Sequence, residues 1–491
     1  MSNASSGFLL IAVSLLLLST PLQARQNILG GGIVTGIDFS DTQYRGEELT
    51  ENSSSKDVSK QKLSIGPILN FSSKSRTDSL TIRYNPSYAY DLKLSDSNWE
   101  HDFSLLAGRT LSKTFSVSLK EKFLYTDDPN LIDAGNSQSY QGDRRRYWTN
   151  NLSVTTTYNY GQERTVATGY HNSMLRNDYT GVGGYEDYDR HMVDLSLHHR
   201  FSTFWSMSLT TSYTRGLFDP PDPLVVETLS DGLETLSPGI TESGDTRNLS
   251  DDLSEYRADM SLKHLFSRQK SILLQYDFSR TAYDAILRND TDLHNLSIAV
   301  DYQYTKRLAL SFGGGPSYED TETYAPNWNY NAHLGLKYEL TRQSQLSTDI
   351  KKGYEQENFS FNNTTYGRDQ GLTEFWDVNL VLLHNLLRNL RARFFISYRD
   401  ESQENLLYGV SSVTETDTAI QDTDRETLRK ESIFSRDIYQ TGARLRYTFR
   451  RFWTATVSYS YRKQDSELIN DSYDEHRVYL TLAVEKEFLR W

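Results

Sequence analysis

The residues that could do chemistry in this chain form no recognised catalytic or metal-binding motif. Ten histidines are present, but none has the HExxH spacing of a zinc site, and no GxSxG nucleophile motif occurs. His198 and His199 are adjacent, and adjacent side chains of a strand point to opposite faces, which is poor geometry for joint ligation. The chain has no cysteine, which excludes disulfides, thiolate metal sites and c-type haem attachment. We therefore predict no enzymatic activity, no cofactor and no metal site.

Arginines on alternating positions are the main candidates for a functional site. Arg391, Arg393 and Arg399 share one face of a predicted strand over 390–400, opposite an apolar face. Arg444 and Arg446 have the same arrangement within 436–449. If these two strands are adjacent and antiparallel, the five guanidinium groups form one basic stripe. Comparable faces of other predicted strands add further charged candidates: Lys120, Lys122, Asp259, Lys263, Asp277 and Asp301.

Two interpretations of these charges are open. In the functional one, the basic stripe and the acidic or mixed region place a field across a pore, which orients and selects charged solutes. In the structural one, the arginines pair with carboxylates of the wall or loops and only fill a wet interior. A charge that faces lipid at the midplane costs about 2–4 kcal/mol, so polar residues collect on an inner face whatever the function.

The elements that must position these residues are strands with period-two alternation. Apolar or aromatic residues alternate with polar ones from Trp453 to Arg462, whereas helical spacings of three and four do not recur. This pattern predicts a transmembrane, antiparallel, up-and-down β-barrel of about twenty strands. The expected spans are 28–41, 61–72, 79–92, 98–110, 115–126, 145–159, 164–175, 188–200, 205–216, 254–266, 271–283, 293–304, 308–320, 328–340, 345–356, 372–386, 390–400, 436–449, 452–463 and 475–490.

The connections between these spans alternate in length. Every second one is short, as at 111–114, 267–270 and 305–307, while those between are mostly long and polar. Short periplasmic turns and long extracellular loops are typical of outer-membrane barrels, and an even strand number brings both chain ends to one side. The two longest loops, 217–252 and 401–435, are rich in Asp and Glu, and such runs are usually solvated surface.

The seven tryptophans all fall at predicted strand ends. Tryptophan has an apolar body and one N–H donor, so it settles where hydrocarbon meets water. The placement predicts two aromatic belts, one at each membrane interface. Four residues follow long loops and three lie beside short turns or at the chain end: Trp99, Trp148, Trp328 and Trp376, then Trp205, Trp453 and Trp491.

The chain ends carry export signals. An apolar run at 8–18 is followed by Leu22-Gln23-Ala24, which predicts a signal peptide over 1–24 and one barrel domain over 25–491. The last strand alternates and closes with Phe488 and Trp491, which resembles the segment that outer-membrane barrels present to their insertion machinery. Pro67, Pro86 and Pro316 fall inside predicted strands, so we expect β-bulges there.

Bulk composition limits the partners. The net charge is -13 and no basic block occurs, which argues against nucleic acid, since phosphate binding needs clustered Lys and Arg. The mean hydropathy of -0.62 does not exclude a barrel, because only its lipid face must be apolar. We expect contact with outer-membrane lipid and lipopolysaccharide. The strand lengths and the absence of short repeats weigh against a soluble β-solenoid adhesin.

The first part of the mature chain resembles a known family. Its segments include GGIVTGIDFSD at 31–41, RYNPSYAY at 83–90, WEHDFSL at 99–105 and TFSVSL at 114–119. They are similar to the β-barrel porins of Gram-negative bacteria found beside exopolysaccharide and exosortase (PEP-CTERM) systems. The resemblance covers about residues 30–130 and implies an outer-membrane channel for small hydrophilic or charged solutes. The alternative is a non-conducting, export or scaffold barrel that works with a periplasmic partner, in polysaccharide secretion or a porin–cytochrome conduit.

Overall fold

The computed structural model of this protein describes ten ranges of the chain. These ranges are 25–45, 58–127, 146–178, 187–219, 252–284, 290–321, 326–357, 371–404, 433–467 and 472–491. The predicted signal peptide and most of the two long acidic loops lie outside the described residues. The described residues contain no helix that is both long and apolar enough to cross a membrane.

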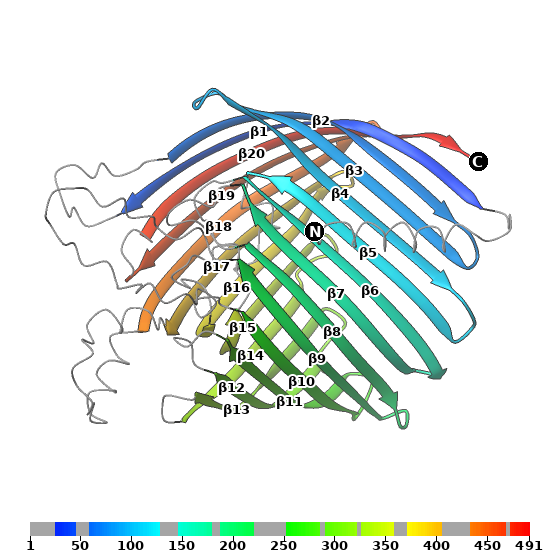
Figure 1. The fold of residues 1–491 in the computed structure, drawn as a ribbon, viewed down its shortest axis with the longest axis vertical. Helices are drawn as coiled ribbons and strands as arrows, with labels where there is room; N and C mark the ends of the chain where they lie inside the picture. The colour runs from blue at the N-terminus through cyan, green and yellow to red at the C-terminus, as the bar shows by residue number, and fades with distance from the viewer. Residues whose placement is uncertain are drawn as a thin grey trace, which may run out of the picture.

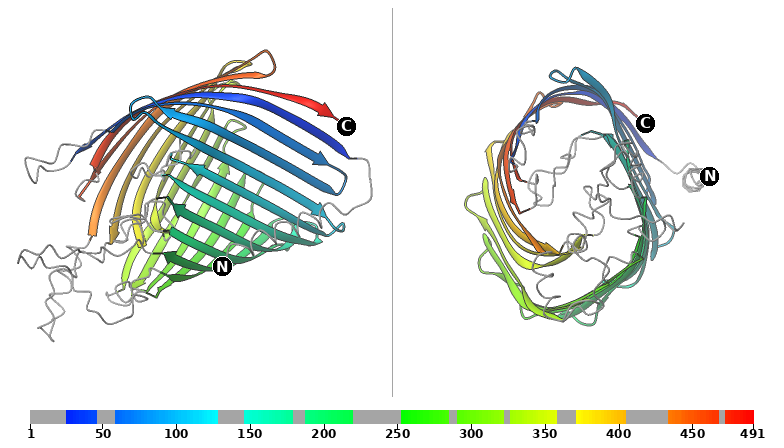
Figure 2. Two further views of the ribbon diagram at one scale, coloured as in Figure 1. Left: turned by 45° about the horizontal axis from the view of Figure 1, so that its top comes forward. Right: turned by 60° about the vertical axis from the view of Figure 1, so that its left-hand side comes forward.

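The strands form one antiparallel sheet that closes on itself as a barrel of 20 strands (Figures 1 and 2). Each strand pairs with its neighbours in the chain, and β1 pairs with β20 to close the ring. The predicted fold class and the predicted strand number are confirmed. The strands are β1 (Gln26–Arg45), β2 (Val58–Lys74), β3 (Asp78–Asp91), β4 (Asp96–Thr110), β5 (Phe115–Thr126), β6 (Tyr147–Gly161), β7 (Arg164–Asn177), β8 (Asp187–Arg200), β9 (Trp205–Asp219), β10 (Leu253–Leu265), β11 (Lys270–Tyr283), β12 (Thr291–Gln303), β13 (Leu308–Thr321), β14 (Asn327–Glu339), β15 (Ser344–Glu357), β16 (Gly371–Leu387), β17 (Leu390–Glu404), β18 (Ile433–Phe449), β19 (Trp453–Ser466) and β20 (Ser472–Arg490).

Several strands extend beyond the predicted spans, mostly toward the long loops. β2, β17 and β18 begin or end three or four residues further out than the alternation of apolar residues predicts. The residues added to β17 and most of those added to β2 are polar, so hydropathy gives little sign of them, whereas β18 gains Ile433 and Phe434. The added residues stay in the ladder because the neighbouring strand supplies their backbone hydrogen bonds.

Hydroxyl side chains shape the short turns. In the turn between β4 and β5, the Ser112 hydroxyl accepts hydrogen bonds from the backbone N–H groups of Thr114 (3.2 Å) and Phe115 (3.0 Å). The same arrangement recurs at Ser267 and Thr305. Serine and threonine favour such turns because the hydroxyl replaces a backbone acceptor. We call the barrel end that these turns form the short-turn mouth.

The prolines are accommodated without β-bulges, so that expectation is wrong. The β2–β3 ladder keeps one register, with Ile65 opposite Tyr88 and Leu69 opposite Tyr84. The positions between, which include Pro67 and Pro86, are not paired in this ladder. Since proline has no N–H to donate, placing the two prolines opposite one another loses a ladder bond without shifting the strands. The β12–β13 ladder skips Pro316 in the same way.

The closing ladder does contain a register shift. It lies at Leu29/Gly30, where β1 meets the end of β20. The shift leaves Phe488 as an extra residue in β20 and accounts for the break in alternation between Phe488 and Trp491. Beside it, a Cβ atom on Gly32 would clash with the carbonyl oxygen of Val484, so the closing strands approach closely only because residue 32 is glycine.

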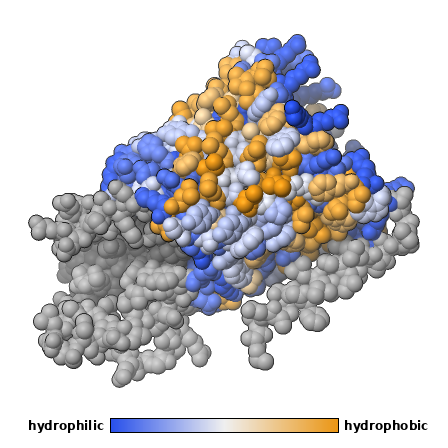
Figure 3. Space-filling view, turned by 90° about the horizontal axis from the view of Figure 1, so that it is seen from above, coloured by the Kyte–Doolittle hydropathy of each residue, from blue (hydrophilic) through white to orange (hydrophobic). Residues whose placement is uncertain are grey.

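The two faces of the wall differ in their contacts. Arg399 of β17 pairs with Glu355 of β15, and Lys62 of β2 pairs with Glu100 of β4. Side chains of strands that are not neighbours meet only on the concave face, so these residues line the lumen. Large exposed apolar residues such as Ile33, Val193 and Ile396 occupy the opposite register. Figure 3 shows part of the outer face, where apolar side chains gather between hydrophilic margins.

Candidate functional site on the inner wall

Four of the predicted arginines come together near the short-turn mouth. Arg391 lies directly opposite Arg446 in the β17–β18 ladder, and Arg393 lies opposite Arg444. Opposed residues of an antiparallel ladder have their Cβ atoms roughly 4.5–5.5 Å apart, and like charges there are destabilising. We call Arg391, Arg393, Arg444 and Arg446 the arginine quartet.

The inward ladder positions directly beside the quartet, on β16 and β19, carry no carboxylate. Arg391 and Arg393 adjoin Asn385 and Leu383 of β16 in the ladder. Arg446 and Arg444 adjoin Thr456 and Ser458 of β19. Within the described ranges, Arg391, Arg393 and Arg446 make no ion pair. The neighbouring strands therefore leave this patch with a positive charge.

A cavity of about 520 Å³ lies against the quartet. It is lined by all four arginines, by the β14–β15 turn with Arg342 and Gln343, and by one carboxylate, that of Glu339. Arg391 and Arg446 are exposed, while Arg393 and Arg444 are half-buried. The guanidinium groups therefore border an open cavity, where they can offer N–H donors to an anion.

Arg399 does not belong to the quartet, which corrects the prediction of five clustered arginines. It lies six residues from Arg393, or about 20 Å along the strand. Its side chain is 2% exposed and its Nε donates to Glu401 Oε2 at 2.7 Å. A second guanidinium nitrogen pairs with Glu355, and Arg436 donates to Glu401 Oε1 at 2.9 Å. Arg399 is thus neutralised inside a buried ion-pair network.

Comparable buried ion pairs occur elsewhere near the loop end, and the sequence did not single them out. Lys62, which is 6% exposed, pairs with Glu100 and with Asp127. Arg477 donates to both carboxylate oxygens of Asp38, at 2.9 and 2.7 Å. These residues do occupy inward positions of the alternating pattern, which is the only sequence signal that marks them. In each of these ion pairs the charges neutralise each other within the wall, so they do not provide a net charge that could attract a solute.

The predicted acidic and mixed region lies on a different part of the wall, on β10 to β12. Asp259 and Asp277 are directly opposed across the β10–β11 ladder. Gln275 Nε2 donates to both carboxylate oxygens of Asp277, at 2.9 and 3.1 Å. Lys263 Nζ lies 3.5 Å from Asp301, which also accepts from Ser271 Oγ at 3.1 Å.

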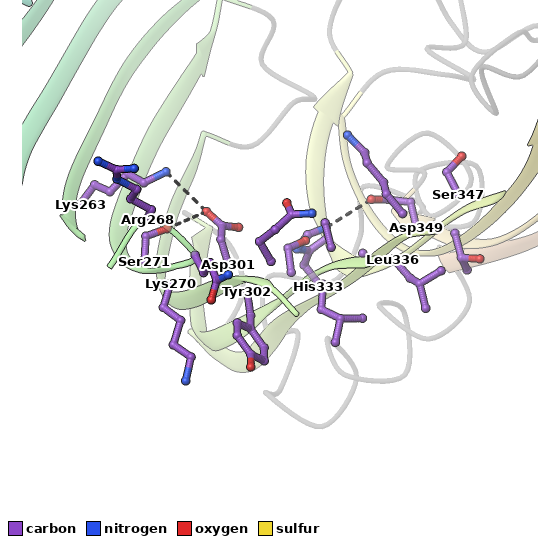
Figure 4. A pocket seen from close by; sticks show the side chains of 18 of the residues that line it. Lys263, Arg268, Lys270, Ser271, Asp301, Tyr302, His333, Leu336, Ser347 and Asp349 are labelled. Atoms are coloured by element: carbon purple, nitrogen blue, oxygen red, sulfur yellow. Dashed lines mark hydrogen bonds and ion pairs between the residues drawn. The ribbon is translucent and has the colours of Figure 1, made fainter. Parts of the chain in front are cut away.

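Three of these residues, Lys263, Ser271 and Asp301, border a second cavity, of about 680 Å³, near the short-turn mouth (Figure 4). Lys263 and Asp301 line one side of it, and the hydrogen-bonded pair of His333 and Asp349 lines the other. Lys120 and Lys122 lie on β5, with the ladder partners Leu106 and Ser104 on β4. Both lysines are exposed on the inner face. The inner wall therefore carries separate basic and acidic areas.

The tryptophans lie on the outer face at the strand ends. Trp99 and Trp328 are 55% and 69% exposed near the long loops, and Trp205 is 42% exposed beside a short turn. Trp148 and Trp376 lie at the loop end and Trp453 at the short-turn end. Trp491 is exposed at the chain end beside β1, where its backbone N–H donates to the Asn27 carbonyl oxygen at 3.0 Å.

The histidines contribute mainly to structure. His101, His191, His294 and His476 each share a hydrogen bond with the hydroxyl of a tyrosine on the adjacent strand, at 2.8–3.0 Å. These pairs lie on the outer face toward the loop end, where a polar atom without a partner would be costly. Within the part of the chain that the structure describes, no group of three or more His, Asp or Glu side chains is placed to hold a metal ion.

Comparison with solved structures finds similar barrels. The siderophore receptor PiuA from Acinetobacter baumannii has a TM-score of 0.50 at 10% identity, over 93% of this chain and 82% of that one. The siderophore receptor PirA from Pseudomonas aeruginosa has a TM-score of 0.49 at 10% identity, over 96% and 81%. OpdO of the same organism has a TM-score of 0.41 at 11% identity, over 94% and 98%. At such identities the likeness shows the fold alone, that of outer-membrane barrels.

The sequence matches no protein-family model and no curated protein. The resemblance to barrels found beside exopolysaccharide systems therefore stays a prediction.

Proposed function

We propose that this protein is an outer-membrane channel that passes small hydrophilic solutes and favours anions at its short-turn mouth. The single observation that carries the proposal is the arginine quartet. Two Arg–Arg pairs face each other across one ladder, and no carboxylate stands beside them on β16 or β19. Opposing like charges in this way costs stability, and an anion that passes the mouth would offset that cost.

The contrast with Arg399 supports a functional role for the quartet. If inward arginines served only to fill the interior, each would be expected to meet a carboxylate, as Arg399 meets Glu355 and Glu401. The three quartet members without an ion pair depart from that pattern. A patch of net positive charge at a pore entrance attracts anions and repels cations.

The outer face supports the proposed location. Exposed tryptophans lie at both ends of an apolar outer wall, as expected for a barrel that spans a bilayer. The partners of this proposal are outer-membrane lipid, lipopolysaccharide and the barrel insertion machinery. The short-turn mouth would face the periplasm.

Reconstitution in planar bilayers tests the proposal. The mature chain should insert and give stepwise conductance, with a reversal potential of anion-selective sign under a KCl gradient. A barrel that inserts but never conducts would contradict the channel function. A chain that stays soluble without detergent would contradict the membrane location.

A second candidate is an export or scaffold barrel with a periplasmic partner. The observation that favours it is the charge of the short turns, which carry exposed Arg76, Lys113, Arg268, Lys306, Arg307, Arg342, Arg388, Arg450 and Arg451. Such a rim suits a partner with an acidic surface. This function requires a partner that co-purifies with the protein and is lost when the rim is neutralised.

A further inference from the structure

The wall has one boundary where the backbone ladder stops early. In the β14–β15 ladder, only Ala332–Glu339 of β14 pairs with Gln345–Lys352 of β15. Both strands continue toward the long loops, where β14 still pairs with β13 as far as Asn327 and β15 still pairs with β16 as far as Glu357. Residues 327–331 and 353–357 thus face each other without ladder pairing. Among the described strand pairs, no other leaves both partners unpaired over such a length. We call these two stretches the seam.

Side chains hold the seam in place of backbone bonds. Lys352 Nζ donates to Asn329 Oδ1 at 3.0 Å and to Glu374 Oε1 at 2.9 Å. Asn329 Nδ2 donates to the Tyr354 hydroxyl at 2.6 Å. Side-chain bonds of this kind can exchange partners without the concerted unzipping that a ladder requires, so this boundary is the part of the wall best able to open.

The seam joins two different environments. On its inner side, a cavity of about 390 Å³ is lined by Asn331 and Gly353 together with polar lumen residues such as Asp277 and His333. Leu273 and Phe375 add apolar surface to the same cavity. On its outer side, Trp328, Tyr330 and Trp376 are exposed at the height of the aromatic belt. A molecule that bridges the seam would have its polar part in the lumen and its apolar part in the bilayer.

From this geometry, we propose that the seam is a lateral portal through which a single-chain amphiphile, an aliphatic tail with a polar head group, moves between the lumen and the surrounding bilayer. The proposal rests on the membrane location proposed above, but it does not depend on conduction along the barrel axis. Lys352 and Glu374, which are hydrogen-bonded partners in the closed state, offer a cation and an anion to the head group when they separate.

The absence of cysteine makes a direct test possible. A Cβ atom on Gly353 would lie 4.0 Å from the Asn331 Cβ, and disulfides need a Cβ separation of about 3.5–4.5 Å. The double variant Asn331→Cys/Gly353→Cys can therefore be locked across the seam by oxidation and released by reduction. A control variant, Asn379→Cys/Ser397→Cys, locks two residues that are already opposed in the β16–β17 ladder.

The probe is a diazirine-bearing C16 fatty acid in phosphatidylcholine vesicles that contain the full mature protein. Because Phe375 lines the cavity, photolabelling of peptide 371–387 should occur in the wild type and in the reduced seam variant. It should be lost on oxidation of the seam variant and persist in the oxidised control. No labelling of this peptide in the wild type, labelling that survives the seam lock, or equal loss in the control would each overturn the proposal.

Two further readouts separate this proposal from the channel function. Axial conductance of the seam variant should be the same before and after oxidation. A barrel that is photolabelled at the seam but does not conduct would therefore contradict the channel function and leave the portal proposal standing. If the cysteine variant folds poorly, hydrogen exchange of the wild-type protein tests whether the seam can open. Amides of 327–331 and 353–357 should lose protection before those of the adjoining β13 and β16, and equal protection would refute a seam able to open.

Discussion

Removing the charge of the arginine quartet should abolish the anion preference of the channel. The perturbation is the quadruple variant in which Arg391, Arg393, Arg444 and Arg446 become Gln. Glutamine keeps a polar side chain of moderate length, so the wet inner face and its packing are retained. The variant also relieves two opposed like-charge pairs, so it should fold at least as stably as the wild type.

The magnitude follows from Coulomb's law. Each guanidinium group at roughly 8 Å from a passing ion contributes about 0.5 kcal/mol in a water-like dielectric. With a Debye length of about 10 Å at 0.1 M salt, four such groups together contribute roughly 1 kcal/mol. This corresponds to about a fivefold enrichment of anions at the mouth and a similar depletion of cations.

The assay is the reversal potential under a KCl gradient in planar bilayers. The variant should lose anion selectivity at 0.1 M, and the difference from the wild type should vanish at about 1 M, where the Debye length is about 3 Å. A matched control neutralises Arg76, Lys113, Lys306 and Arg307, which are exposed in short turns away from the quartet. Both variants lose four positive charges from a chain of net charge -13. An unchanged reversal potential in the quartet variant, or an equal change in the control, would refute the reasoning.

Three further outcomes test the structure. Arg399→Met should lower the free energy of unfolding in lipid vesicles by about 3–5 kcal/mol, because it removes a buried cation from Glu355 and one of the two buried cations that pair with Glu401. Arg391→Met should change it little, and equal losses in urea titrations would contradict the distinction. Gly32→Ala should prevent closure of β1 on β20, because its Cβ would clash with the Val484 carbonyl, and loss of the compact, heat-modifiable band on gels would show this. Gly353→Ala should fold normally, because its Cβ would lie 3.9 Å from the Phe375 ring, an ordinary van der Waals contact. Trp328, at 69% exposure, should be quenched by lipids brominated near the head group more than by lipids brominated at the chain end, and the reverse order would place the belt at another depth.

The alternation of residues in the sequence was enough to predict the barrel. Period two assigns each residue to one of two faces, and the alternation of short and long connections predicts an even number of strands. Residue alternation and connection length are both local properties of the sequence. They are enough to predict twenty strands that pair in chain order and tryptophans that face outward. Glu121 is an exception in hydropathy: period two places it on the outer face between the inward Lys120 and Lys122, with the ladder partners Leu105 and Leu152.

The sequence did not determine which inward charges are neutralised. Arg399 and Arg393 share one face of one strand, yet Arg399 meets Glu355 of β15 and Arg393 meets no carboxylate in the described residues. Such partners stand two strands away, and the curvature and tilt of the closed sheet decide which side chains converge on the concave face. Neither quantity is encoded in the period of any single strand.

The early end of the β14–β15 ladder is likewise a tertiary property. Both strands alternate normally toward the long loops, and nothing in their composition predicts that the ladder stops at Lys352. Strand pairing depends on how two backbones lie relative to each other once the ring has closed, while alternation reports only which face a side chain occupies. The sequence alone therefore specifies the strands and the face on which each residue lies. The closed barrel determines which inward charges stay unpaired and where two neighbouring strands lose their ladder pairing.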